Sequence, residues 1–137
     1  MRPTVLDASV VAKLVFPEHD SDRETDRVAT LVAQGVPLHA PDLLFTEVAS
    51  VAARKVRRRE ATARDARDLL RVCETLGIRT WPGRDLAPAA LEIAMTLGCS
   101  VYDATYLALA VHLDADLATA DKVLERAATR LGRRLPP

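Results

Sequence analysis

The chain has 137 residues, of which 49% are hydrophobic and 28% charged, a balance that suits one globular domain with a real core and excludes a disordered chain. The 19 basic residues equal the 19 acidic ones, so net charge gives no argument for a nucleic-acid partner and only a local patch could indicate one. The chain has no apolar run near the roughly 20 residues that span a bilayer, so we expect no membrane partner.

Four short strand-like segments are widely spaced along the chain, at residues 4–6, 37–40, 78–81 and 116–119. Helical patterns fill the gaps, at residues 9–16, 22–34, 42–58, 62–76, 85–97, 102–113 and 121–131, and Pro17 is expected to end the first. Strands that alternate with helices predict a parallel sheet covered by helices. We therefore predict one α/β domain over residues 1–137, with about seven helices and four or five strands, the fifth in doubt after Leu131.

The two cysteines and the start of the chain bear on localisation. Cys73 and Cys99 both fall in apolar helical contexts, which favours buried free thiols, although their spacing leaves a disulfide open. The first residues run directly into residues 4–6 without the architecture of a signal peptide. Both observations lead us to expect a cytoplasmic protein.

Four acidic residues stand in apolar surroundings: Asp7, Glu47, Asp103 and Asp121. Asp7 and Asp121 follow the carboxyl ends of predicted strands, where ligands of open α/β sheets gather. Glu47 and Asp103 have apolar neighbours three and four residues away on their helices, so each carboxylate faces inward or lines a cleft rim. We therefore expect the four carboxylates to converge on one pocket.

Such a cluster has the chemistry of a metal site. A buried carboxylate costs several kcal/mol unless a partner compensates it, and Mg²⁺ takes oxygen ligands. A metal-bound water becomes a nucleophile near neutral pH, which suits phosphodiester hydrolysis. We hypothesise that Asp7, Asp103 and Asp121 hold Mg²⁺ directly or through water, and that Glu47 holds it or positions the attacking water.

Each acid also has a purely structural interpretation. Asp7, Asp121 and either Ser100 or Asp103 could cap the helices that follow them, and for any one of them capping is at least as plausible as catalysis. Glu47 lies within a helix and caps nothing. Taken together, the four acids favour the metal site.

Two charged stretches lie outside this set. The basic stretch at residues 54–59 could contact a phosphate backbone, could complement a helix dipole, or could dock an acidic partner, and the sequence does not rank these alternatives. Its candidate contact residues for nucleic acid or a partner are Arg54, Lys55, Arg57 and Arg58. The acidic run of Asp20, Asp22, Glu24 and Asp26 is expected to be solvated at the start of a helix.

The four acids occur in segments that together resemble one family. Residues 5–11 resemble the opening of PIN-domain proteins, and Glu47 sits where their second acid lies. Residues 102–110 resemble the helix that carries the third acid, and residues 117–121 resemble the strand-end motif that carries the fourth. The similarity covers essentially the whole chain in order, and the chain is similar in length to the VapC-type toxins of toxin–antitoxin pairs.

The resemblance implies a PIN-like fold and an endoribonuclease that depends on Mg²⁺, with Mn²⁺ as a substitute. It implies an RNA substrate, inhibition by a cognate antitoxin protein, and a homodimer. By analogy, Asp7, Glu47, Asp103 and Asp121 would form the metal site, and Thr119 would lie beside it.

Two other functions stay open. A signalling receiver domain is also a small α/β unit with acids at strand ends, but it needs a pair of acids after the first strand and a phospho-accepting Asp on a middle strand. Only Asp7 follows the first strand here, and neither middle strand supplies a clear acceptor. The third alternative is a catalytically silent binding scaffold, although a silent pocket has no need of four uncompensated charges.

Overall fold

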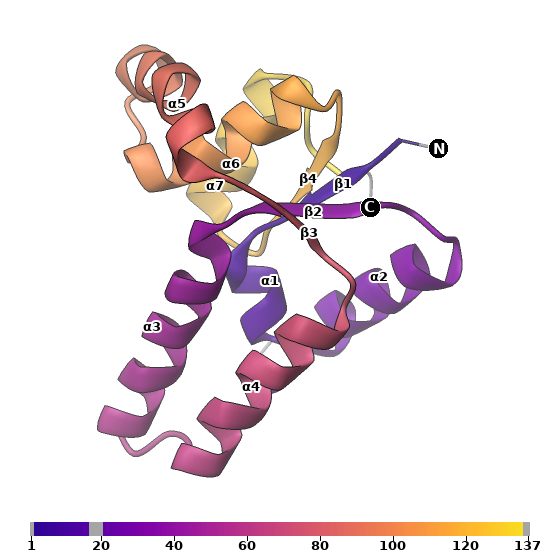
Figure 1. The fold of residues 1–137 in the computed structure, drawn as a ribbon, viewed down its shortest axis with the longest axis vertical. Coiled ribbons are helices and arrows are strands. Elements are labelled where there is room, and N and C mark those ends of the chain that lie inside the picture. The colour runs from indigo at the N-terminus through magenta and orange to yellow at the C-terminus, as the bar shows by residue number, and fades with distance from the viewer. Residues whose placement is uncertain (1, 17–20, 136–137) are drawn as a thin grey trace.

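Four short parallel strands form the centre of the molecule, in the spatial order β3-β2-β1-β4 (Figure 1). The computed structural model describes residues 2–16 and 21–135, except for the side chains of residues 21 and 22. The strands are β1 (Thr4–Leu6), β2 (Leu38–Pro41), β3 (Arg79–Trp81) and β4 (Asp116–Ala118). Each strand end lies within one residue of its predicted position, and the predicted parallel α/β sheet is confirmed.

Seven helices surround the sheet. They are α1 (Ala8–Ala12), α2 (Ser21–Ala33), α3 (Leu43–Arg57), α4 (Ala63–Thr75), α5 (Gly83–Leu97), α6 (Val101–His112) and α7 (Lys122–Arg130). In Figure 1, α5, α6 and α7 lie on one side of the strands and α1 to α4 on the other. Helices α3 and α4 pack on each other as a hairpin that extends away from the sheet, and α5 packs on α6.

Helix α6 is the central helix of the core. Seven consecutive residues, 104–110, are buried, because the helix packs against β1, β2 and β4 on one side and against α5 on another. A helix that is apolar nearly all round must be enclosed in this way. The burial holds the first turn of α6, which carries Asp103, in a fixed position relative to the sheet.

The register between β1 and β4 determines which residues meet at the carboxyl edge of the sheet. Leu6 pairs with Ala118 as the last residue of each strand, and the Asp7 amide donates to the Ala118 carbonyl over 3.1 Å. Asp7 and Thr119 are the next residues on the two strands. The sheet therefore brings residues 112 positions apart in sequence side by side.

The first helix is shorter than predicted. It ends at Ala12 instead of residue 16, because the chain tightens into turns in which Leu14 bonds back to Val11 and Val15 to Ala12. The buried Phe16 follows these turns. The proposed helix stop at Pro17 lies outside the described residues.

No fifth strand forms within the described residues. After α7 the chain makes one isolated parallel bridge, between Arg134 and Leu117 of β4. The Leu117 amide donates to Arg133, and the Leu135 amide donates to the Leu117 carbonyl. This short contact covers the outer edge of β4 and keeps Arg134 close to that strand.

The helices and cysteines test two further expectations. Over residues 2–16 and 21–135 no single helix has the length and apolarity to cross a bilayer, and only α5 and α6 together, bent by 113°, reach that length and composition. Cys73 and Cys99 are both free thiols, as expected.

Candidate metal centre

Asp7 is held at the carboxyl edge of the sheet by two hydroxyl groups. Ser9 Oγ donates to Asp7 Oδ2 over 2.6 Å, and Thr119 Oγ1 donates to the same oxygen over 2.8 Å. Ser9 Oγ accepts from the Ala120 amide, and Thr119 Oγ1 accepts from the Asp121 amide, both over 3.0 Å. This network fixes the orientation of the Asp7 carboxylate and ties it to the loop after β4.

Asp7 is buried, with only 6% of its surface exposed. Burial raises the pKa of its carboxyl above the ordinary 3.8, and the charge of Asp121 raises it further. The hydrogen bonds from Ser9, Thr119 and the Ala8 backbone lower the pKa but do not cancel the effect of burial. Although Asp7 occupies the N-cap position of α1, its side chain makes no capping bond, so capping does not explain the residue.

Glu47 and Asp103 are half-buried and electrostatically coupled to Asp7. Burial raises the pKa of Glu47, and the charges of Asp7 and Asp103 add to that rise. Burial also raises the pKa of Asp103, and the charges of Asp121 and Asp7 add to it. Because each carboxylate disfavours ionisation of another, the structure brings all four predicted acids into one electrostatic unit.

The capping interpretation holds for Asp121 and Ser100. Asp121 Oδ1 accepts from the Val123 and Leu124 amides over 2.8 and 3.1 Å at the start of α7. Ser100 Oγ accepts from the Asp103 amide, so Ser100 and not Asp103 caps α6. Asp121 therefore caps a helix and also faces the acidic cluster, on whose members its charge acts.

Two further polar side chains, Ser9 and Tyr106, adjoin this cluster without having been predicted from the sequence. Ser9 binds Asp7 directly, and its only sequence signal is a hydroxyl two residues after a strand-end acid. Tyr106 is fully buried beside Glu47, and burial together with the charges of Asp7 and Glu47 raises the pKa of its phenol. Glu47 acts on Tyr106 electrostatically, but the Tyr106 hydroxyl has no hydrogen-bond partner of normal geometry in the described part of the chain.

The donor set fits a hard cation by its chemistry. It offers carboxylate oxygens at a water-accessible edge, and Glu47 Oε1 is buried without a hydrogen-bond partner among the described residues. No three Asp, Glu, His or Cys side chains in the described structure stand close enough to form a ready-made ligand group. The carboxylates of Asp7 and Asp121 are held by hydrogen bonds, whereas Glu47 and Asp103 are half-buried at the same cluster.

The predicted basic contact residues lie at the far end of α3. Ten residues separate Glu47 from Arg57, about 15 Å along the helix axis. Arg54, Arg57 and Arg58 are exposed there, but Lys55 lies over the Phe16 ring and 3.6 Å from Glu60. Contact by this stretch with RNA or with a protein partner stays a prediction.

The family of the chain follows from a match to known protein families. The family model described as PIN domain matches residues 4–130, which includes all four acids. The chain belongs to the PIN-domain family. This membership confirms the resemblance read from the sequence and decides against the receiver domain.

Curated relatives of this PIN-domain chain include VapC ribonucleases. It is 32% identical over 124 residues to Ribonuclease VapC3 of Pyrobaculum aerophilum, a match that covers 88% of this chain and 90% of the relative. It is 38% identical over 84 residues to Ribonuclease VapC9 of Mycobacterium tuberculosis, covering 61% of this chain and 65% of the relative.

Two solved structures share the fold. PAE2754 from Pyrobaculum aerophilum aligns with a TM-score of 0.71 at 20% identity, over 92% of this chain and 79% of that one. VapC20 of Mycobacterium tuberculosis is described as a sarcin-ricin loop cleaving toxin. It aligns with a TM-score of 0.71 at 18% identity, over 90% of this chain and 94% of that one. At these identities the similarity establishes the fold, which is that of a PIN domain.

Proposed function

We propose that this PIN-domain protein is a Mg²⁺-dependent endoribonuclease, with Mn²⁺ as a substitute, and that it is the toxin of a toxin–antitoxin pair. The observation that carries the proposal is the coupling of Asp7, Glu47, Asp103 and Asp121 at one edge of the sheet. The relatives named as VapC ribonucleases support the RNA substrate and the antitoxin partner.

In this proposal, Asp7, Asp103 and Asp121 hold the metal directly or through water, and Glu47 holds it or orients the attacking water. A divalent cation bound there supplies charge neutralisation at the phosphoryl group and acidifies a coordinated water. Ser9 and Thr119 keep the Asp7 carboxylate oriented, because both donate to Oδ2. A half-buried carboxylate with a raised pKa, such as Glu47, is suited to accept a proton near neutral pH.

We also propose a homodimer in the cytoplasm. Several large apolar side chains are exposed on α5 and on the first turn of α6, next to Asp103 in sequence: Leu91, Met95, Val101 and Tyr102. Met95 is 63% exposed and Tyr102 is 68% exposed, and exposed apolar side chains that gather on one surface indicate an interaction site. A second copy of the chain that covers this surface would bury them.

The direct test is RNA cleavage by Asp7→Asn. This substitution keeps the size of the side chain and its hydrogen-bond acceptor but removes the charge at the centre of the cluster. We expect wild type to cleave single-stranded RNA with Mg²⁺ and to lose activity with EDTA, and Asp7→Asn to be inactive while folded. Full Mg²⁺-dependent cleavage by Asp7→Asn would refute the assignment.

A metal-binding experiment distinguishes the nuclease from the alternative of a catalytically silent scaffold. Calorimetric titration of Mg²⁺ or Mn²⁺ into metal-free protein should show saturable heat for wild type and a much weaker response for Asp103→Asn. A scaffold should bind no divalent ion.

A further inference from the structure

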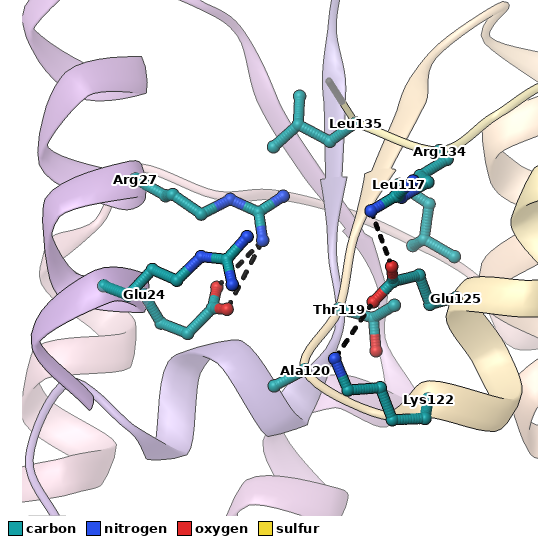
Figure 2. Close-up of a pocket in the computed structure, with 10 residues that line it drawn as sticks. Glu24, Arg27, Leu117, Thr119, Ala120, Lys122, Glu125, Arg134 and Leu135 are labelled. Atoms are coloured by element: carbon teal, nitrogen blue, oxygen red, sulfur yellow. Dashed lines mark hydrogen bonds and ion pairs between the residues drawn. The ribbon is translucent and has the colours of Figure 1, made fainter. Parts of the chain in front are cut away.

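A polar pocket lies between α2 and the α7 side of the molecule, against β4 (Figure 2). We call it the arginine pocket and define it by its charged lining residues Arg23, Glu24, Arg27, Lys122, Glu125 and Arg134. Its volume is about 120 Å³. That space holds only a few water molecules, which suits a small polar group such as a phosphate better than a nucleoside.

The basic side chains enter the pocket from opposite sides. Figure 2 shows Arg27 reaching from α2 toward β4, with Lys122 and Arg134 facing it from the α7 side. Arg134 pairs with Glu125 over 2.9 Å, and Lys122 lies 4.0 Å from the same carboxylate. Four basic and two acidic side chains line the pocket, so its described lining carries an excess of two positive charges.

The burial of Glu24 shows that the arginine pocket extends below the protein surface. The sequence predicted Glu24 to be solvated, but the structure buries it to 5% exposure. Arg27 Nη1 lies 3.3 Å from both Glu24 oxygens, one helical turn away, which explains how the carboxylate is accommodated. Asp20 and the side chain of Asp22, from the same acidic run, lie outside the described part of the structure.

Arg27 is held in place beside the pocket by its pair with Glu24. Its Nε is buried and has no hydrogen-bond partner in the described residues, although Nη1 is engaged by Glu24. A guanidinium offers five N–H donors in a planar fork that matches a phosphate group. The pocket therefore combines net positive charge with a donor held in place.

Thr119 connects the arginine pocket to the acidic cluster. It lines the pocket, and its hydroxyl donates to Asp7 Oδ2 over 2.8 Å. If one phosphate of an RNA strand lies at the acidic cluster, a neighbouring phosphate of the same strand would therefore lie close to the arginine pocket.

We propose that the arginine pocket binds one backbone phosphate of the RNA, next to the phosphate that is cleaved. The proposal rests on the proposed nuclease function. Phosphate contacts position a nucleic acid without reading its sequence, so the pocket sets where along the strand the acidic cluster acts. Arg23, Arg27 and Arg134 are positioning residues for this phosphate, because charge-assisted hydrogen bonds from arginine are strong and directional.

The test combines variants with single-site changes in the RNA. An RNA that wild type cuts at one position is prepared as a series in which each member carries one neutral methylphosphonate linkage. We expect one linkage near the cut to slow wild-type cleavage about fivefold or more, beyond the effect at flanking linkages. The double variant Arg23→Gln/Arg134→Gln should cleave the unmodified RNA about tenfold more slowly and lose that position-specific effect, because the contact is already absent.

Two controls separate charge from folding. Arg64→Gln/Arg67→Gln removes the same two charges from exposed positions on α4 and should behave like wild type. Arg23→Lys/Arg134→Lys keeps the charge and should restore part of the rate. If Arg134→Gln lowers the melting temperature through loss of its Glu125 pair, Arg23→Gln alone serves as the test. Arg27 is left unchanged because it compensates the buried Glu24.

The outcomes distinguish this proposal from the proposed function. Binding of a fluorescein-labelled oligouridylate in EDTA, followed by anisotropy, needs no cleavage. If wild type cuts no RNA but binds the oligonucleotide and Arg23→Gln/Arg134→Gln weakens that binding about tenfold, the nuclease assignment fails and the phosphate site stands. If wild type cuts RNA and the double variant matches it in cleavage and binding, the phosphate site is refuted. Loss of affinity for an acidic peptide alone would also refute it and would assign the pocket to a protein partner.

Discussion

The hydroxyl of Thr119 donates to Oδ2 of Asp7 over 2.8 Å and accepts from the Asp121 amide over 3.0 Å. One buried side chain thus joins the end of β1 to the loop that carries the fourth acid. The contact depends on the register of β1 and β4, which places Asp7 and Thr119 directly after a paired residue on each strand.

Removal of this hydroxyl should affect both stability and activity. Thr119→Val keeps the shape but leaves the buried Asp7 carboxylate without one donor and the part-buried Asp121 amide without its acceptor, so the free energy of unfolding should fall by about 1–3 kcal/mol. Loss of a hydrogen bond that lowers the pKa of Asp7 should also move the acidic limb of the cleavage pH profile to higher pH. Urea unfolding and pH–rate measurements check both effects. Thr119→Ser keeps the hydroxyl and should have the stability and the pH profile of wild type. An unchanged profile in Thr119→Val would show that Thr119 does not act on Asp7.

Asp7→Asn should stabilise the metal-free protein in a pH-dependent way. Folding raises the pKa of Asp7 above 3.8, so the folded state binds more protons than the unfolded state between 3.8 and the raised value. The free energy of unfolding that this group contributes therefore falls as pH rises through that interval. Asp7→Asn has no carboxyl group at this position and does not lose this contribution. Its free energy of unfolding should therefore exceed that of wild type at neutral pH, and the difference should shrink as the pH falls toward 3.8. Urea unfolding in EDTA at several pH values measures it, and a pH-independent difference would contradict burial as the cause.

Divalent cations should stabilise the folded protein. A ligand that binds only the folded state at a hundred times its dissociation constant adds about 2.7 kcal/mol to the free energy of unfolding. We expect Mg²⁺ and Mn²⁺ to raise the melting temperature of wild type, and Glu47→Gln and Asp103→Asn to reduce that rise. Sodium chloride at equal ionic strength controls for screening of the acidic cluster. The same rise with sodium chloride would mean that no specific site exists.

The buried pair of Glu24 and Arg27 should matter for stability although it lies in an acidic run. Glu24→Ala leaves Arg27, only 22% exposed at its side chain, without its partner, and should cost about 1–3 kcal/mol of unfolding free energy. Asp26→Ala, an exposed acid two residues later, should stay within about 0.5 kcal/mol of wild type. Chemical denaturation of the two variants provides the comparison. Equal losses of unfolding free energy in the two variants would indicate that Glu24 is solvated, as the sequence predicted.

The proposed dimer should depend on the apolar surface of α5 and α6. Met95→Arg or Leu91→Arg places a charge where a second copy would bury an apolar side chain, and should yield a monomer in light-scattering chromatography. Val32→Arg changes an exposed valine on α2 in the same way and should leave the oligomeric state unchanged. Dimers that persist in both α5 variants would place the interface elsewhere.

Sequence reasoning located the elements because strands and helices alternate cleanly along the chain, and it located Asp7 because a charge directly after an apolar strand is unusual. It did not find Ser9, because a lone hydroxyl carries no pattern until the backbone turns it toward Asp7. It misjudged Glu24, because local charge density predicts exposure and only the packed structure shows Arg27 compensating a buried carboxylate. Residues 13–16 kept a helical pattern of apolar side chains, whereas the chain there forms turns around the buried Phe16.

The pairing of β1 with β4 has a consequence for biosynthesis. Asp7 emerges from the ribosome early, but its donor Thr119 follows 112 residues later. A nascent chain that has not yet released β4 therefore has a first carboxylate without its Thr119 donor, and it lacks the fourth acid. If the protein is a toxin, the cell making it is shielded from partly translated copies by the order in which the site is assembled.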